Sequence, residues 1–76
     1  MNNRISINPK ICHGKPVIAG TRVLASNIFG ALASGESIED ILNDYPNITK
    51  EDIYAVLEFG SELSSFEMNA YENMAS

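Results

Sequence analysis

The spacing of apolar residues predicts two short helices in the middle of the chain. Apolar residues recur at helical spacing over 25–34, and Gly35 follows where a left-handed C-terminal cap is expected. A second apolar face begins after Ser37, which can form a capping box with Asp40 three residues later. Pro46 lies just beyond this face and indicates the end of the second helix.

A third predicted helix has the clearest start signal in the chain. Thr49 is a suitable N-cap with Asp52 at the reciprocal position, and Ile48 and Ile53 have the spacing of a hydrophobic staple. Because no proline follows, we expect this helix to run from Lys50 to about Met68 or beyond. Its predicted buried stripe comprises Ile53, Val56, Leu57, Gly60 and Leu63.

Residues before the first helix carry the pattern of short strands. Ile5-Ser6-Ile7 alternates apolar and polar residues, and Pro9 ends the run. Val17-Ile18 and Thr21-Arg22-Val23 flank Ala19-Gly20, which predicts a tight hairpin with positive φ at Gly20. We therefore predict a mainly α fold, a short N-terminal β-hairpin followed by three helices, of helix-turn-helix or winged-helix-like type. The predicted organisation is a single domain, 1–76, with a hairpin segment over 5–24, a three-helix part over 25–68 and a frayed tail over 69–76.

Charge divides the chain into two unlike parts. Ten carboxylates against five lysines and arginines give a net charge of -5, which argues against strong non-specific affinity for nucleic acid. All ten carboxylates lie from Glu36 onward, whereas four of the five bases precede it. Any contact with DNA is therefore expected to be weak and salt-dependent. We expect it to involve Lys10, Lys15 and Arg22 more than Lys50.

Few residues could support catalysis or bind a metal ion. Cys12 and His13 are the only cysteine and histidine, too few for a zinc site, and adjacent side chains on an extended segment point apart. Gly14-Lys15 lacks the Ser/Thr and the first glycine of a phosphate loop. We therefore expect no enzymatic activity, cofactor or metal. The chain has no apolar run long enough for a membrane span and no signal-peptide core, so we expect it in the cytoplasm.

A set of motifs over about residues 5–60 resembles domain-of-unknown-function family 433, small prokaryotic antitoxin-like proteins. The residues that carry the resemblance are Ile5, Asn8-Pro9, Ile11-Cys12, Gly14-Lys15-Pro16-Val17-Ile18, Gly20-Thr21-Arg22-Val23, Leu32-Ala33, Gly35-Glu36-Ser37, Glu39, Ile41-Leu42, Tyr45-Pro46, Ile48-Thr49, Glu51-Asp52-Ile53 and Ala55. The resemblance implies a helix-turn-helix or winged-helix-like fold and a partner similar to a PIN-type ribonuclease toxin. It implies no demonstrated activity. His13 departs from the family pattern, which more often has glycine there.

The leading functional hypothesis is an antitoxin-like protein that neutralises such a ribonuclease and binds its own operator DNA. Residues 51–76 carry six carboxylates and no base beside an apolar stripe, a pattern suited to a groove on a basic surface. The residues predicted to bind the partner are Glu58, Phe59, Glu62, Leu63, Phe66 and Tyr71. The large apolar groups among them also predict a homodimer or larger assembly.

Three alternatives stay open at this point. The chain could be a stand-alone helix-turn-helix DNA-binding regulator or a structural oligomerisation module, and the acidic helix face could simply be solvated. Lys15 and Arg22 could equally bind phosphate or have a structural role, with Arg22 clamping a backbone carbonyl or a carboxylate.

Overall fold

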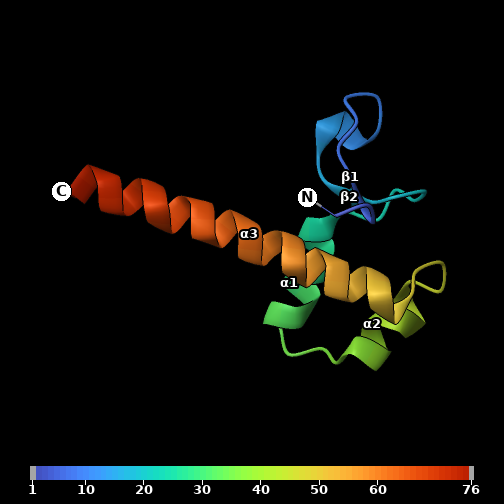
Figure 1. Cartoon of the computed structure of the whole chain (residues 1–76). Coiled ribbons are helices and arrows are strands. Elements are labelled where there is room, and N and C mark those ends of the chain that lie inside the picture. The colour runs from blue at the N-terminus through green and yellow to red at the C-terminus, as the bar shows by residue number, and fades with distance from the viewer. Residues whose placement is uncertain (1, 76) are drawn as a thin grey trace.

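The computed structural model describes residues 2–75, and it describes the side chains of residues 2–63. The elements in chain order are β1 (Ile5–Ser6), the short 3-10 turn η1 (Cys12–Gly14), β2 (Val17–Ile18), α1 (Ala25–Ala33), α2 (Ile38–Asp44) and α3 (Lys50–Ala75) (Figure 1). The predicted mainly α fold, with a short two-stranded sheet before three helices, is confirmed. The helix-turn-helix layout consists of α2, the connection over 45–49 and α3.

The two-stranded sheet joins different segments from those of the predicted hairpin. β1 pairs antiparallel with β2, so that Ile5 lies opposite Ile18 and Ser6 opposite Val17. The predicted partner of β2, the run over 21–23, forms no strand, although an isolated bridge joins Val17 to Leu24. The strand at Ile5 was thus predicted correctly. The predicted turn is present without a second strand after it: the Ile18 N–H donates to the Val23 carbonyl at 3.0 Å.

The Thr21 side chain takes part in this turn. Its hydroxyl donates to the Ile18 carbonyl at 2.7 Å and accepts from the Val23 N–H at 3.0 Å. Gly20 has the expected positive φ of 78°. Ala19 does not, so the turn is not of the primed type I′, which needs positive φ at both central residues.

The helix caps that the sequence predicts are present. Gly35 ends α1 with φ 94°, and the N–H of Glu36 donates to Ala31, the pattern of a Schellman motif. Ser37 and Asp40 form a complete capping box at the start of α2. These caps place the helix ends locally, without help from distant residues.

The core lies between the three helices and the sheet, and α3 supplies one side of it. The buried core residues are Ile5, Ile18, Val23, Ala25, Ile28, Ile41, Ile48, Ile53, Val56 and Phe59. The burial of both Ile48 and Ile53 agrees with the predicted staple. The ends of the predicted stripe differ, because Leu57 is 42% exposed and Leu63 is 47% exposed.

Leu57 and Leu63 are exposed for different reasons. Leu57 is one residue from the fully buried Val56, so it points about 100° away from the core-facing side of α3. Leu63 lies seven residues after Val56, which returns it to nearly the same side of the helix. Leu63 is nevertheless exposed because it lies near the edge of the folded body: Phe59 is the last buried residue along α3 in the part whose side chains are described.

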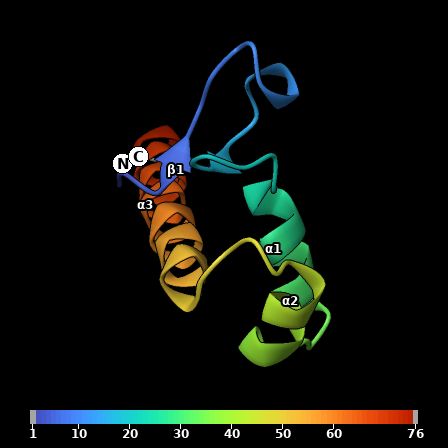
Figure 2. The same cartoon turned by 90° about the vertical axis from the view of Figure 1, so that its right-hand side faces the viewer.

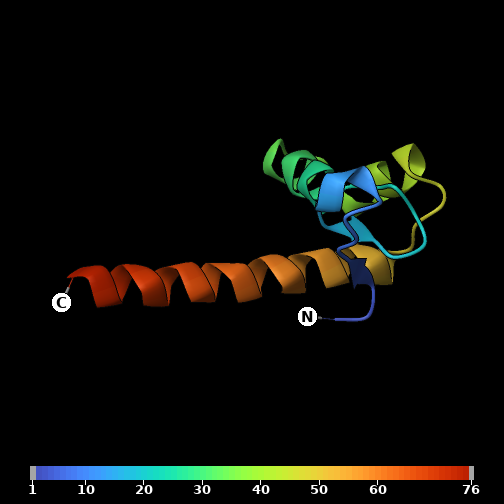
Figure 3. The same cartoon turned by 90° about the horizontal axis from the view of Figure 1, so that it is seen from above.

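Beyond the core α3 continues as an arm that projects from the body (Figure 1). β1 lies against its first turns, and α1 and α2 pack on the other side of the body (Figure 2). Seen from above, α3 forms one layer and the two short helices form a second (Figure 3). The radius of gyration is 13.7 Å, whereas a compact chain of this length has about 11 Å. The helix reaches Ala75, and the expected fraying over 69–76 remains a prediction.

No helix in the described part of the chain is both long enough and apolar enough to cross a membrane.

Candidate protein-binding surface

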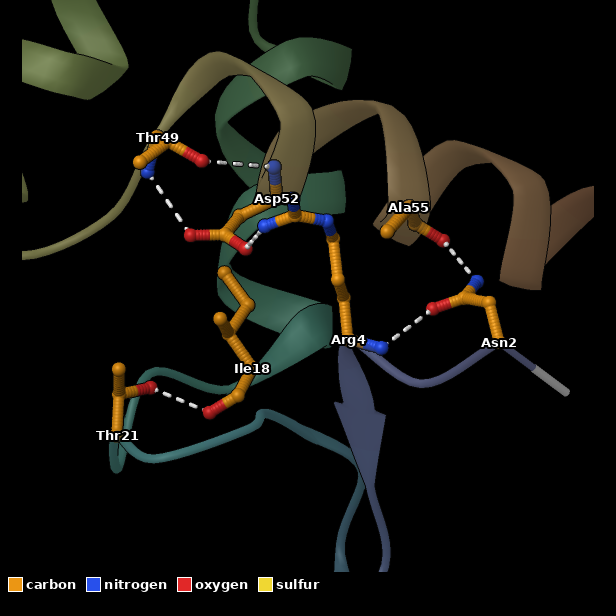
Figure 4. A network of polar contacts seen from close by, with 7 residues as sticks. All are labelled: Asn2, Arg4, Ile18, Thr21, Thr49, Asp52 and Ala55. Atoms are coloured by element: carbon orange, nitrogen blue, oxygen red, sulfur yellow. Dashed lines mark hydrogen bonds and ion pairs between the residues drawn. The ribbon is translucent and has the colours of Figure 1, made fainter.

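A polar network fastens the N-terminal strand to the first turn of α3 (Figure 4). Arg4 Nη1 lies 2.9 Å from Asp52 Oδ1, while the other carboxylate oxygen accepts from the Thr49 N–H at 2.9 Å. The amide of Asn2 donates to the Ala55 carbonyl at 3.0 Å. Asp52 therefore does two things at once: it completes the predicted capping box and anchors the strand.

The protonation of Asp52 depends on this network. Burial raises the pKa of its carboxyl. Hydrogen bonds from the Thr49 backbone and from the Arg4 and Thr49 side chains, together with the Arg4 charge, lower the pKa by a larger amount. The net result is a pKa below the ordinary value for aspartate. The carboxylate thus stays charged at neutral pH, and Arg4 is held in the ion pair with it. The sequence pattern predicts the cap but not the ion pair, since Arg4 and Asp52 are 48 positions apart.

Three of the four predicted nucleic-acid-binding residues lie in the N-terminal part of the fold. Lys10, Lys15 and Arg22 are exposed, and within the described residues no hydrogen bond or ion pair occupies their charged groups. The structural clamp considered for Arg22 is therefore not present there. Lys50 lies apart, at the first residue of α3, with its ammonium 5.7 Å from the centre of the Tyr54 ring.

The loop before β2 has an unusual backbone. Cys12, His13 and Gly14 have consecutive positive φ values of 50°, 58° and 79°. A non-glycine residue in this region costs roughly 1–2 kcal/mol. This cost gives a physical reason why the family that the sequence resembles more often has glycine at the position of His13. The Cys12 thiol donates to the Arg22 carbonyl at 3.9 Å. Among the described residues no group of three or more His, Cys, Asp or Glu could hold a metal ion.

The predicted partner-binding residues fall into three groups. Glu58, Glu62 and Leu63 are exposed on α3. Phe59, predicted as a surface anchor, is instead only 7% exposed and packs in the core, because the helix phase turns it inward. Phe66 and Tyr71 lie outside the residues whose side chains the structure describes.

A shallow groove lies where α3 leaves the body, beside the start of α1. Its volume is about 390 Å³, and its lining consists of Lys15, Pro16, Ala25, Ser26, Phe29, Phe59 and Leu63. We call it the α1/α3 groove. It brings together Lys15, Phe59 and Leu63, which the sequence placed in two separate sites. The four other lining residues were not predicted, because their positions depend on how α1 crosses α3.

Gly60 lets the two walls of this groove approach each other. A Cβ atom at this position would lie 2.6 Å from Cε1 of Phe29, closer than real side chains come. The missing side chain therefore allows the Phe29 ring to rest against the backbone of α3. This contact sets the spacing between the helices and the shape of the α1/α3 groove.

Comparisons with known proteins agree with the fold and with the motifs. The family model described as "Protein of unknown function (DUF433)" matches residues 5–60. A crystal structure of a DUF433 member protein from Anabaena variabilis ATCC 29413 is similar, with a TM-score of 0.75 and 28% sequence identity. The match covers 80% of this chain and 60% of that one. No curated protein matches. The chain belongs to the DUF433 family of proteins of unknown function.

Proposed function

We propose that the protein is an antitoxin-like binding protein that neutralises a PIN-type ribonuclease through the exposed acidic face of α3. The observation that carries this proposal is the arm of α3. Fifteen residues follow Gly60 in this helix, a length of about 22 Å. This part of the helix extends beyond the body of the fold, where a partner can approach it (Figure 1).

The charge of α3 favours a basic partner. Glu51 and Glu58 are exposed on the described part of the helix, seven residues apart and therefore on one side of it. From Glu51 to the last residue the sequence has six carboxylates and no base. A ribonuclease must attract RNA phosphates with lysines and arginines, so an acidic helix is complementary to its substrate-binding surface. Leu63, 47% exposed, adds an apolar contact further along α3, about 140° around the helix axis from Glu58.

The cytoplasm is the compartment that fits the proposal. RNA substrates and a ribonuclease toxin meet there. Cys12 carries a free thiol, as is usual in a reducing compartment.

The test is co-expression with a PIN-type nuclease encoded by the adjacent reading frame, followed by co-purification and an RNA cleavage assay. We expect the full chain to bind and inhibit, and Glu51→Gln/Glu58→Gln to weaken inhibition by at least about tenfold. Glu39→Gln/Asp44→Asn removes two exposed carboxylates from α2 and serves as the matched control. Equal loss in both double variants would show that net charge, and not α3, matters.

Truncation after Gly60 tests the arm itself. The shortened chain keeps every core residue that the structure describes and should therefore stay folded, as circular dichroism can check. We expect it to lose inhibition. If the folded, shortened chain silences the nuclease as well as the full chain does, the arm has no part in neutralisation and the proposal is wrong.

A second candidate function, binding of operator DNA, is favoured by one observation. The exposed charges of Lys10, Lys15 and Arg22 have no partner within the described residues. The start of α3 is less suited to a DNA groove, because Glu51 is exposed there and β1 covers one side through the Arg4 contact. DNA binding would therefore depend on the N-terminal bases. A gel-shift series on the upstream promoter, at several salt concentrations, tests this candidate.

A further inference from the structure

The α1/α3 groove has the features of an incomplete interface. Its walls are largely apolar, formed by the half-buried Phe29, the buried Phe59 and the exposed Leu63. Among the residues whose side chains are described, Lys15 is the only charged one that lines it. Leu63 is 47% exposed although it continues the core-facing side of α3. The core-facing side of α3 is therefore exposed to solvent at Leu63, and the open groove lies beside it.

We propose that the α1/α3 groove receives the arm of α3 from a second copy of this chain, in a symmetric dimer. This inference goes beyond the proposed function and does not depend on it. The occupant is identified by charge. Residues 1–35 contain four lysines and arginines and no carboxylate, whereas α3 from Glu51 onward contains only acidic charges. Lys15, at the groove, then meets carboxylates of the partner's arm.

The position of the groove favours a closed pair over an open chain of molecules. Leu63 lines the groove and also begins the arm, so the two surfaces lie next to each other on one helix. If two copies place their arms antiparallel, each arm lies over the other copy's groove at the same time. Such a self-complementary contact closes with twofold symmetry.

The experiment is sedimentation equilibrium of the full chain alone, from about 1 to 100 μM, where a dimer of this size should form and dissociate. We expect Leu63→Asp to raise the dissociation constant at least about tenfold. Leu57→Asp is the matched control, since Leu57 is 42% exposed on the same helix and does not line the groove. We expect it to leave the constant unchanged.

Two further variants change residues that line the groove outside α3. Ser26→Arg places a long side chain into the groove from an exposed position, and Lys15→Glu reverses the charge beside it. Both should weaken the dimer, while Lys10→Glu, outside the groove, should have less effect. Raising the salt concentration should weaken the native dimer more than the Lys15→Glu dimer.

Three outcomes would overturn the inference: a full chain that stays monomeric at 100 μM, as roughly the upper limit of a specific weak dimer; equal dissociation by Leu57→Asp and Leu63→Asp; or a dimer unaffected by Ser26→Arg. No nuclease is present in this experiment, and neither Glu51 nor Glu58 lines the groove. Failure of the dimer would therefore leave ribonuclease neutralisation standing, and the reverse also holds.

Discussion

Replacing Gly60 with alanine tests how closely α1 and α3 pack. The new Cβ would lie 2.6 Å from Cε1 of Phe29, so either the ring or the helix must move. Phe29 is half-buried and packs against the core, which means that moving the ring sacrifices contacts. Gly30, in the middle of α1, is the matched control, because a Cβ there meets nothing within 4 Å.

Two opposing effects decide the stability of the Gly60→Ala protein. Alanine in a helix interior is favoured over glycine by about 1 kcal/mol. Overpacking of a close contact costs typically about 1–3 kcal/mol. Since the atom that clashes belongs to a packed ring, we expect the steric cost to prevail and the free energy of unfolding to fall by about 1 kcal/mol. Gly30→Ala should gain about 0.5–1 kcal/mol from helix propensity alone.

Thermal and urea unfolding, followed by circular dichroism at one fixed protein concentration, measure both variants. A difference of about 2 kcal/mol between them corresponds to roughly 8–16 °C in Tm for a domain of this size. Phe29→Leu in the Gly60→Ala background should recover part of the loss, since it removes the clashing ring atoms. If both alanine variants are stabilised alike, Phe29 moves at no cost and the close approach of α1 to α3 does not constrain the fold.

The remaining predictions concern acid stability, the loop before β2 and nucleic acid. The pKa of Asp52 is lowered in the folded state, so its stabilising effect is complete above about pH 4, the unfolded value, and is lost as the pH falls through the lower folded value. Urea unfolding between about pH 3 and 6 should therefore show a shallower pH dependence for Asp52→Asn, and an unchanged slope would contradict this account. His13→Gly should raise the free energy of unfolding by about 1 kcal/mol, because His13 has φ 58°; a destabilised variant would mean that the imidazole makes a needed contact. Any DNA affinity should fall with salt and respond more to alanine at the N-terminal bases than at α3, which gel shifts can measure with Lys10→Ala, Lys15→Ala, Arg22→Ala and Lys50→Ala. Dominance of Lys50 alone would instead support recognition by α3.

The features predicted well from the sequence are those with local causes. Gly35, Ser37 and Thr49 act on backbone groups within a few residues, so the helix ends follow from the residue types alone. The same holds for the positive φ of Gly20. Periodicity also identified Ile53 and Val56 as buried.

The errors concern contacts between distant segments. β1 pairs with β2 across the intervening loop, and this contact between separate segments cannot be read from strand propensity. Leu63 has the right phase for burial, but the sequence does not show where the body ends. The α1/α3 groove was divided between two predicted sites for the same reason: Lys15 and Leu63 meet only after α1 has crossed α3.

The Arg4–Asp52 contact also sets an order of events during synthesis of the chain. The strand is made first, yet its partner carboxylate follows 48 residues later. At roughly 5–20 residues per second, Asp52 is added about 2–10 s after Arg4. Ala55, whose carbonyl accepts from Asn2, is added later still. Until then the N-terminal strand can pair with β2 but cannot dock. The body therefore closes only after the first turns of α3 have been made.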